Sequence, residues 1–242
     1  MDRAIEIFGI LGAIITISLG LPQLIKQAKS KETGKISFTS FWVFYIGIVL
    51  WTAYGLFSGF GYWQVFSANF ICGLIYTGTM ILLYKYKKDI SKRAFVAGMV
   101  GIAIVLLIFL SLLVLFVFSA IGYFTNRKYI PTLTEGQIGI LAAIAPSLTT
   151  FAFLPQLVIC IKQKSFHGIT IWMAIVYLMN NGVWVTYFIL KGVHSSAWRE
   201  VIPAIVWQIV SITIYGLQFG LTLKYNRLAK NNAESKQILQ SL

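Results

Sequence analysis

The chain has 242 residues, of which 58% are hydrophobic and only 11% are charged. Soluble domains carry about 25% charged residues, so this composition excludes an ordinary water-soluble domain. The net charge of +13 would suit a nucleic-acid-binding protein, but the placement of the lysines argues for a different origin of the charge.

Six long stretches of the chain contain no Asp, Glu, Lys or Arg, and they lie at 7–25, 36–84, 94–126, 136–161, 165–190 and 201–223. About 20 apolar residues span a bilayer as a helix, so five of these stretches predict one crossing each. The stretch 36–84 is long enough for two crossings, with a turn at the Gly-containing segment 58–61. The sequence therefore predicts an all-α integral membrane protein with seven transmembrane helices.

The basic residues gather on one side of these predicted crossings. If the N-terminus is placed outside, 15 of the 20 Lys and Arg residues fall on the opposite side, in the segments 26–35, 85–93, 162–164 and 224–236. Basic loops remain in the cytoplasm. We therefore expect a multi-pass protein of the plasma membrane with its N-terminus outside and its C-terminus in the cytoplasm, and no nucleic-acid partner.

The tetrapeptide Leu-Pro-Gln-Leu occurs twice, at 21–24 and at 154–157. The offset of 133 between the copies also aligns Trp51 with Trp184, and after a six-residue insertion an offset of 139 aligns Tyr76 with Tyr215. Each copy covers three crossings, and the remaining crossing near 95–118 restores the orientation of the second copy. The predicted 3+1+3 organisation divides the chain into a first repeat (1–93), a linker helix and outer loop (94–136), a second repeat (137–230) and a cytoplasmic tail (231–242).

Two such motifs at equivalent places in two three-helix units resemble the PQ-loop superfamily, and the 3+1+3 layout with Trp51 and Trp184 is similar to its SWEET and SemiSWEET branch. The resemblance implies a membrane transporter whose substrate pocket is formed by one Trp and one Asn from each repeat. It therefore assigns substrate binding to Trp51, Asn69 and Trp184, while Gln208 stands where the second Asn is expected.

The depth of these residues in the membrane points to the same site. Trp51 precedes the turn at 58 by 7 residues and Asn69 follows Gly61 by 8, which places both about 10–12 Å below the outer surface. Trp184 and Gln208 have the same spacing from the end of their helices, and Asn180 and Asn181 lie one turn away. Indole faces and carboxamides suit a neutral polyol. The alternative is that the tryptophans belong to an interfacial belt and the amides join helices.

The two prolines predict a second kind of functional position. Proline inside a helix frees the carbonyl four residues earlier, so we expect Pro22 and Pro155 to kink their helices on a face turned to the interior. We interpret both as hinges, with a static packing kink as the alternative. Gln23 and Gln156 would bridge the freed backbone groups or line the pathway.

The sequence shows no buried carboxylate for proton coupling, no nucleophile–base pair and no metal-ligand spacing, so we expect neither an enzyme nor a cofactor. The favoured function is facilitative, alternating-access uniport of a small neutral polar solute, a mono- or disaccharide above others. The alternatives are transport of an amino acid, nucleoside or vitamin, proton-coupled as in cystinosin-like proteins, and a receptor or accessory role without transport. Small residues on the first and last helices are assigned to packing, with a homo-oligomer face as the alternative.

Overall fold

A computed structural model describes residues 1–31, 38–88, 90–131, 133–152, 154–155, 158, 162, 171–196 and 198–240. Within these ranges the chain forms seven α-helices and one short 3-10 helix and contains no strand, which confirms the predicted all-α class. In the described part of the chain, five helical segments are by themselves long and apolar enough to cross a membrane: Asp2–Ser30, Phe38–Phe57, Phe60–Tyr86, Lys92–Thr125 and Trp198–Tyr225.

The first repeat consists of α1 (Asp2–Ser30), α2 (Phe38–Phe57), the 3-10 helix η1 (Phe60–Tyr62) and α3 (Trp63–Tyr86). The chain turns between α2 and η1 as predicted. The turn requires a φ of 91° at residue 59, a backbone conformation that glycine adopts readily and residues with a side chain rarely adopt. The carbonyl of Gly59 then accepts the N–H of Tyr62 at 3.0 Å and closes the turn.

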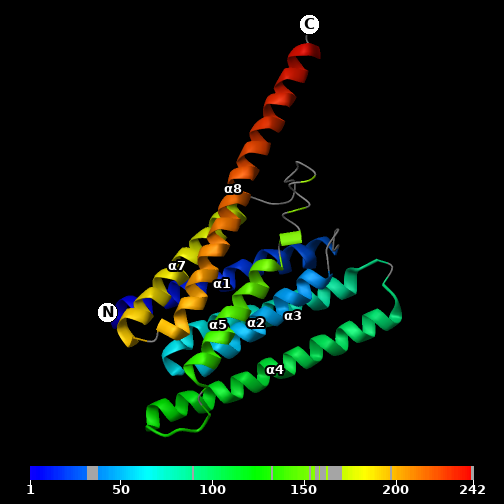
Figure 1. The fold of residues 1–242 in the computed structure, drawn as a ribbon. Coiled ribbons are helices and arrows are strands. Elements are labelled where there is room, and N and C mark those ends of the chain that lie inside the picture. Colours follow the sequence, from blue (N-terminus) through cyan, green and yellow to red (C-terminus); the bar gives the residue numbers. More distant parts are fainter. Residues whose placement is uncertain are drawn as a thin grey trace.

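The second repeat consists of α5 (Glu135–Phe151), α7 (Ile171–Ser195) and α8 (Trp198–Gln240). A capping box starts α5, in which Thr134 and Gln137 satisfy each other's backbone N–H groups. In Figure 1, α8 continues as one helix well beyond the other elements. The predicted boundary at residue 230 therefore lies inside a helix.

The helices pack with the symmetry that the repeated sequence predicts. Within the first repeat α3 contacts both α1 and α2, and within the second repeat α8 contacts both α5 and α7. Between the repeats, α2 packs on α5 and α1 packs on α7. Exchanging α1, α2 and α3 for α5, α7 and α8 maps this pattern onto itself, which is compatible with two parallel three-helix units.

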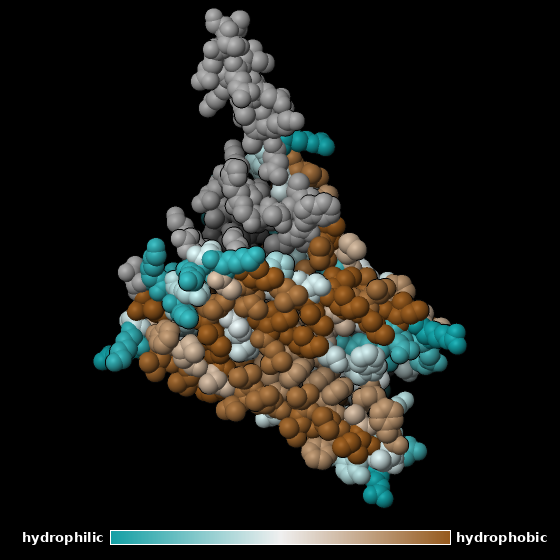
Figure 2. Space-filling view, turned by 180° about the vertical axis from the view of Figure 1, so that it is seen from behind, coloured by the Kyte–Doolittle hydropathy of each residue, from teal (hydrophilic) through white to brown (hydrophobic). Residues whose placement is uncertain are grey.

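The linker helix α4 (Lys92–Thr125) lies along one side of the bundle and packs on α2 and α3 (Figure 1). It is longer than the expected 95–118, and its 34 residues span about 51 Å. Exposed apolar side chains follow one side of α4, among them Val100, Ile104 and Leu107. Figure 2 shows apolar side chains over the middle of one face of the molecule and hydrophilic ones at its margins, as an integral multi-pass membrane protein requires.

Candidate functional site

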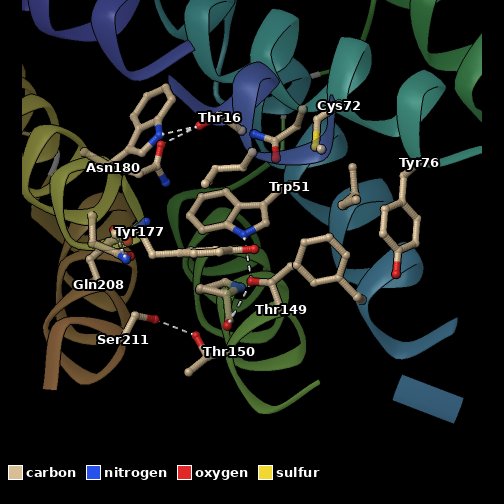
Figure 3. A pocket seen from close by; sticks show the side chains of 18 of the residues that line it. Thr16, Trp51, Cys72, Tyr76, Thr149, Thr150, Tyr177, Asn180, Gln208 and Ser211 are labelled. Atoms are coloured by element: carbon tan, nitrogen blue, oxygen red, sulfur yellow. Dashed lines mark hydrogen bonds between the residues drawn. The ribbon is translucent and has the colours of Figure 1, made fainter. Parts of the chain in front are cut away.

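A cavity of about 190 Å³ lies between α1, α2, α3, α5, α7 and α8 (Figure 3). It is lined by both repeats, and none of its described lining residues comes from α4. All six residues that the sequence proposes for substrate binding line this cavity: Trp51, Asn69, Asn180, Asn181, Trp184 and Gln208. The structure therefore brings together side chains that are up to 157 positions apart in the sequence.

Equivalent positions of the two repeats line the cavity in pairs, which places it on the axis that relates the repeats. The pairs at offset 133 are Thr16 with Thr149, Phe44 with Tyr177, Ile48 with Asn181, and Trp51 with Trp184. Those at offset 139 are Asn69 with Gln208, Cys72 with Ser211, and Tyr76 with Tyr215.

The two tryptophans are held by hydrogen bonds that cross between the repeats. The indole N–H of Trp184 on α7 donates to the hydroxyl of Thr16 on α1 at 2.9 Å. The indole N–H of Trp51 on α2 donates to the hydroxyl of Thr149 on α5 at 3.4 Å (Figure 3). Each indole is thereby fixed by the opposite repeat, and its orientation depends on how the two repeats are placed.

The carboxamides keep hydrogen-bonding capacity for a ligand. Asn69 donates one N–H to the carbonyl of Val65 at 2.9 Å, which leaves its oxygen and second N–H without a partner among the described residues. The buried amide of Gln208 makes no hydrogen bond to any described residue. A buried amide without a partner is destabilising, so these two groups are suited to a polar molecule in the cavity.

The two walls of the cavity differ in polarity. The second repeat lines the cavity with the polar side chains of Asn180, Asn181 and Ser211. The oxygen of Asn180 accepts a hydrogen bond from Thr16 of the first repeat at 2.9 Å, and Ser211 pairs with Thr150 at 2.7 Å. On the side of the first repeat the equivalents of Asn181 and Ser211 are Ile48 and Cys72. The residue of the first repeat that is equivalent to Asn180 is Gly47. Even a Cβ atom at Gly47 would lie only 2.7 Å from Thr149 Cγ2, so this position has no room for a side chain. The symmetric frame therefore holds an asymmetric site.

An aromatic cluster closes the cavity toward the end of the bundle where α1 begins. Phe188 lies between the two indoles, with ring centroids 6.2 Å from Trp51 and 5.9 Å from Trp184. Each Trp also meets the Tyr three residues later edge to face, Tyr54 at 5.6 Å and Tyr187 at 5.3 Å. These five rings are all buried and belong to one apolar core.

Polar contacts between the repeats reinforce this closed end. The hydroxyl of Tyr54 donates to the Glu200 carbonyl at 3.3 Å, and that of Tyr187 donates to Gln64 Oε1 at 3.4 Å.

At the rim the Lys191 ammonium lies 4.7 Å from the centre of the Tyr62 ring, and His194 Nε2 lies 2.9 Å from a carboxylate oxygen of Asp2. The structure therefore represents a state closed at this end.

The proposed hinge residues have different surroundings. Pro22 lies inside a continuous α1 and is exposed, Pro155 is exposed as well, and neither is among the described residues that line the cavity. Successive helical residues are separated by about 100°, and the next residue, Gln23, lines the cavity. Gln156 lies outside the described residues. The proline that does line the cavity is Pro146 on α5.

Sequence reasoning missed Thr16, Thr149 and Phe188. The two threonines could have been found from the offset of 133 that they share with the tryptophans. Phe188 carries no such signal, because its equivalent in the first repeat is Gly55. Within the described part of the chain, no three His, Cys, Asp or Glu side chains come together as a metal site would require.

Comparisons with known proteins agree with this architecture. A family model described as the PQ loop repeat matches residues 4–64. The sugar transporter SemiSWEET of Bradyrhizobium diazoefficiens is 30% identical over 82 residues, which cover 34% of this chain and 93% of that protein. An uncharacterized protein of Methanocaldococcus jannaschii is 32% identical over 79 residues, which cover 33% of this chain and 76% of that protein.

The fold also resembles that of a solved eukaryotic SWEET transporter, with a TM-score of 0.63 over 93% of this chain and 98% of that chain. At 16% sequence identity this likeness concerns the fold. The SemiSWEET relative is matched over nearly its whole length by a stretch about as long as one predicted repeat, and the family model falls on the first repeat. The chain belongs to the PQ-loop family of membrane proteins, in its SWEET and SemiSWEET branch.

Proposed function

We propose that this protein is a facilitative transporter that carries a small neutral sugar, a mono- or disaccharide, across the plasma membrane by alternating access. The observation that carries the proposal is the cavity between the repeats, where two indoles and the amides of Asn69 and Gln208 surround one space. The names of the SemiSWEET and SWEET relatives as transporters support a transport function over an enzymatic one.

The chemistry of the lining supports a neutral polyol as the substrate. An indole face packs against the C–H face of a sugar ring, and an amide both donates and accepts hydrogen bonds to hydroxyl groups. The described lining residues include no Asp, Glu, Lys, Arg or His. A charged solute would enter this cavity without a counter-charge, which is strongly unfavourable in a low-dielectric interior.

The same lack of charge among the described lining residues supports uniport. Proton coupling in membranes uses ionisable side chains placed in the pathway. In this proposal the solute follows its own concentration gradient. The cavity opens alternately to the two sides of the membrane as the two repeats move relative to each other, with Trp51 and Trp184 at the interface between them. Opening of the closed end would separate Phe188 from Trp51, since these residues belong to different repeats.

The function is tested by uptake of labelled neutral sugars into liposomes that contain the purified chain, with and without a pH gradient. Saturable uptake that does not respond to the pH gradient is expected, and it should be lost in Trp51→Ala and Asn69→Ala. Trp63→Ala is the matched control, because Trp63 is not among the cavity-lining residues. Uptake of an amino acid, nucleoside or vitamin in place of sugars, or uptake driven by protons, would contradict the proposal.

A further inference from the structure

A second hollow lies at the closed end of the bundle, outside the two-repeat interface. It has a volume of about 650 Å³ and is formed by the end of α2, by η1, by the last turns of α4 and by the loop 126–131. It shares no described lining residue with the cavity between the repeats. Its described lining combines aromatic and aliphatic side chains with Arg127 and Lys128, and none of these described lining residues is acidic.

The cations are presented by a rigid turn. Helix α4 ends where Asn126 adopts a left-handed conformation with a φ of 53°, and the carbonyl of Gly122 accepts the N–H of Arg127 at 2.9 Å. A Cβ atom at Gly122 would lie 2.5 Å from the Arg127 carbonyl oxygen, so only glycine allows the chain to fold back this closely. The turn holds Arg127 and Lys128 beside the end of the helix.

The floor of the hollow is a group of aromatic rings. The Phe60 ring on η1 lies 4.9 Å from that of Tyr123 and 5.6 Å from that of Phe124, both on the last turns of α4. Tyr123 is 62% exposed and Phe124 is 76% exposed. Exposed aromatic rings at the end of an apolar transmembrane helix lie at the level of the lipid headgroups.

Below this level α4 presents a row of exposed apolar side chains. Val114, Val117 and Ile121 are each more than 40% exposed. They continue from the aromatic floor of the hollow along the same helix. A lipid chain that lies against them would have its headgroup beside Arg127 and Lys128.

We propose that this hollow binds one phospholipid with an anionic headgroup, whose phosphate contacts Arg127 and Lys128 and whose acyl chain lies on Phe60 and Phe124. The geometry pairs an apolar floor with two adjacent cations at a membrane boundary, and each cation near a membrane surface strengthens the binding of anionic lipid. The aromatic floor favours a lipid over a free phosphate ion, which would leave that surface in water.

The test is titration of the full chain in detergent with phosphatidylglycerol and phosphatidylcholine of identical acyl chains, with bound lipid counted by native mass spectrometry. The variant Arg127→Ala/Lys128→Ala removes both cations. The matched control is Lys87→Ala/Lys88→Ala, which removes two adjacent cations at the opposite end of α3. Thermal unfolding of each variant establishes that it is folded, independently of any transport activity.

The wild type should retain one phosphatidylglycerol more tightly than phosphatidylcholine. Each cation is expected to strengthen phosphatidylglycerol binding about fivefold, so the loss of both Arg127 and Lys128 should weaken that binding about 25-fold. The control variant should bind as the wild type does, and Phe124→Ala should weaken both lipids. Equal retention of the two lipids by the wild type, an equal loss in both double variants, or displacement of the lipid by millimolar inorganic phosphate would each overturn the proposal.

Discussion

Trp184 donates its indole N–H to Thr16 across the interface between the two repeats, at 2.9 Å. The same hydroxyl donates to the oxygen of Asn180, so one threonine of α1 holds two lining residues of α7. The equivalent bond between Trp51 and Thr149 is longer, at 3.4 Å. The two halves of the candidate site are thus built alike but held with different strength.

The first prediction compares the two threonines. Thr16→Val keeps the shape of the side chain but leaves the Trp184 N–H unpaired, and an unpaired buried donor is unfavourable by about 1–3 kcal/mol. We expect sugar affinity to fall about tenfold, as measured by equilibrium binding. Thr149→Val should have the smaller effect because its bond is longer. A larger loss in Thr149→Val would show that the indole bonds do not shape the site.

A second prediction concerns Gln208, whose amide makes no hydrogen bond to the described chain. Gln208→Leu should leave the melting temperature unchanged or raised, because no internal bond is lost and a buried polar group is removed. The KM for uptake should nevertheless rise about tenfold. The paired measurement of melting temperature and KM separates a binding role from a structural one. An unchanged KM would argue that Gln208 does not contact the solute.

The third prediction addresses the closed end. Phe188→Ala removes the ring between the two indoles and should destabilise the closed arrangement by about 3–5 kcal/mol. In a Cys160→Ser background, Cys72 then reports on the opening, because its thiol lines the cavity. A membrane-impermeant maleimide applied from the side of the α1 start should label Cys72 faster in Phe188→Ala. Equal labelling rates would mean that another group closes this end.

A fourth prediction uses glycines. Gly47→Ala places a Cβ atom 2.7 Å from Thr149 Cγ2, and the resulting overpacking between α2 and α5 should be unfavourable by about 1–3 kcal/mol. Gly182→Ala is the control, because no heavy atom of the described residues lies within 4 Å of the position that its Cβ would occupy. Thermal unfolding should show a lower melting temperature for Gly47→Ala alone. A similar loss in both would point to helix flexibility instead of packing.

The fifth prediction tests the proposed hinges. Pro22→Ala restores a backbone N–H inside α1 and should stiffen the helix. If Pro22 and Pro155 are hinges, each change to Ala should lower the uptake rate far more than the binding affinity. Because Pro22 is exposed and does not line the cavity, direct loss of solute contacts is not expected. Wild-type rates in both variants would leave the prolines as packing features.

The sequence by itself determined the helical class, and it predicted the repeated organisation and the residue pairs of the candidate site. Long uncharged stretches can satisfy their backbone groups in lipid only as helices, and a fixed offset aligns residues without knowledge of the fold. Trp51, Asn69, Trp184 and Gln208 line one cavity for this reason, since equivalent residues at equal depth converge on the axis between two repeats.

Only the tertiary structure decided which residues meet across that axis. The bonds of Thr16 and Thr149 to the indoles and the place of Phe188 between them depend on how α1 packs on α7 and α2 packs on α5. The direction of Pro22 was likewise beyond the sequence, because hydropathy cannot tell the face of an apolar helix that meets lipid from the one that meets protein. Both faces are apolar, and only packing against neighbouring helices fixes the rotation of each one.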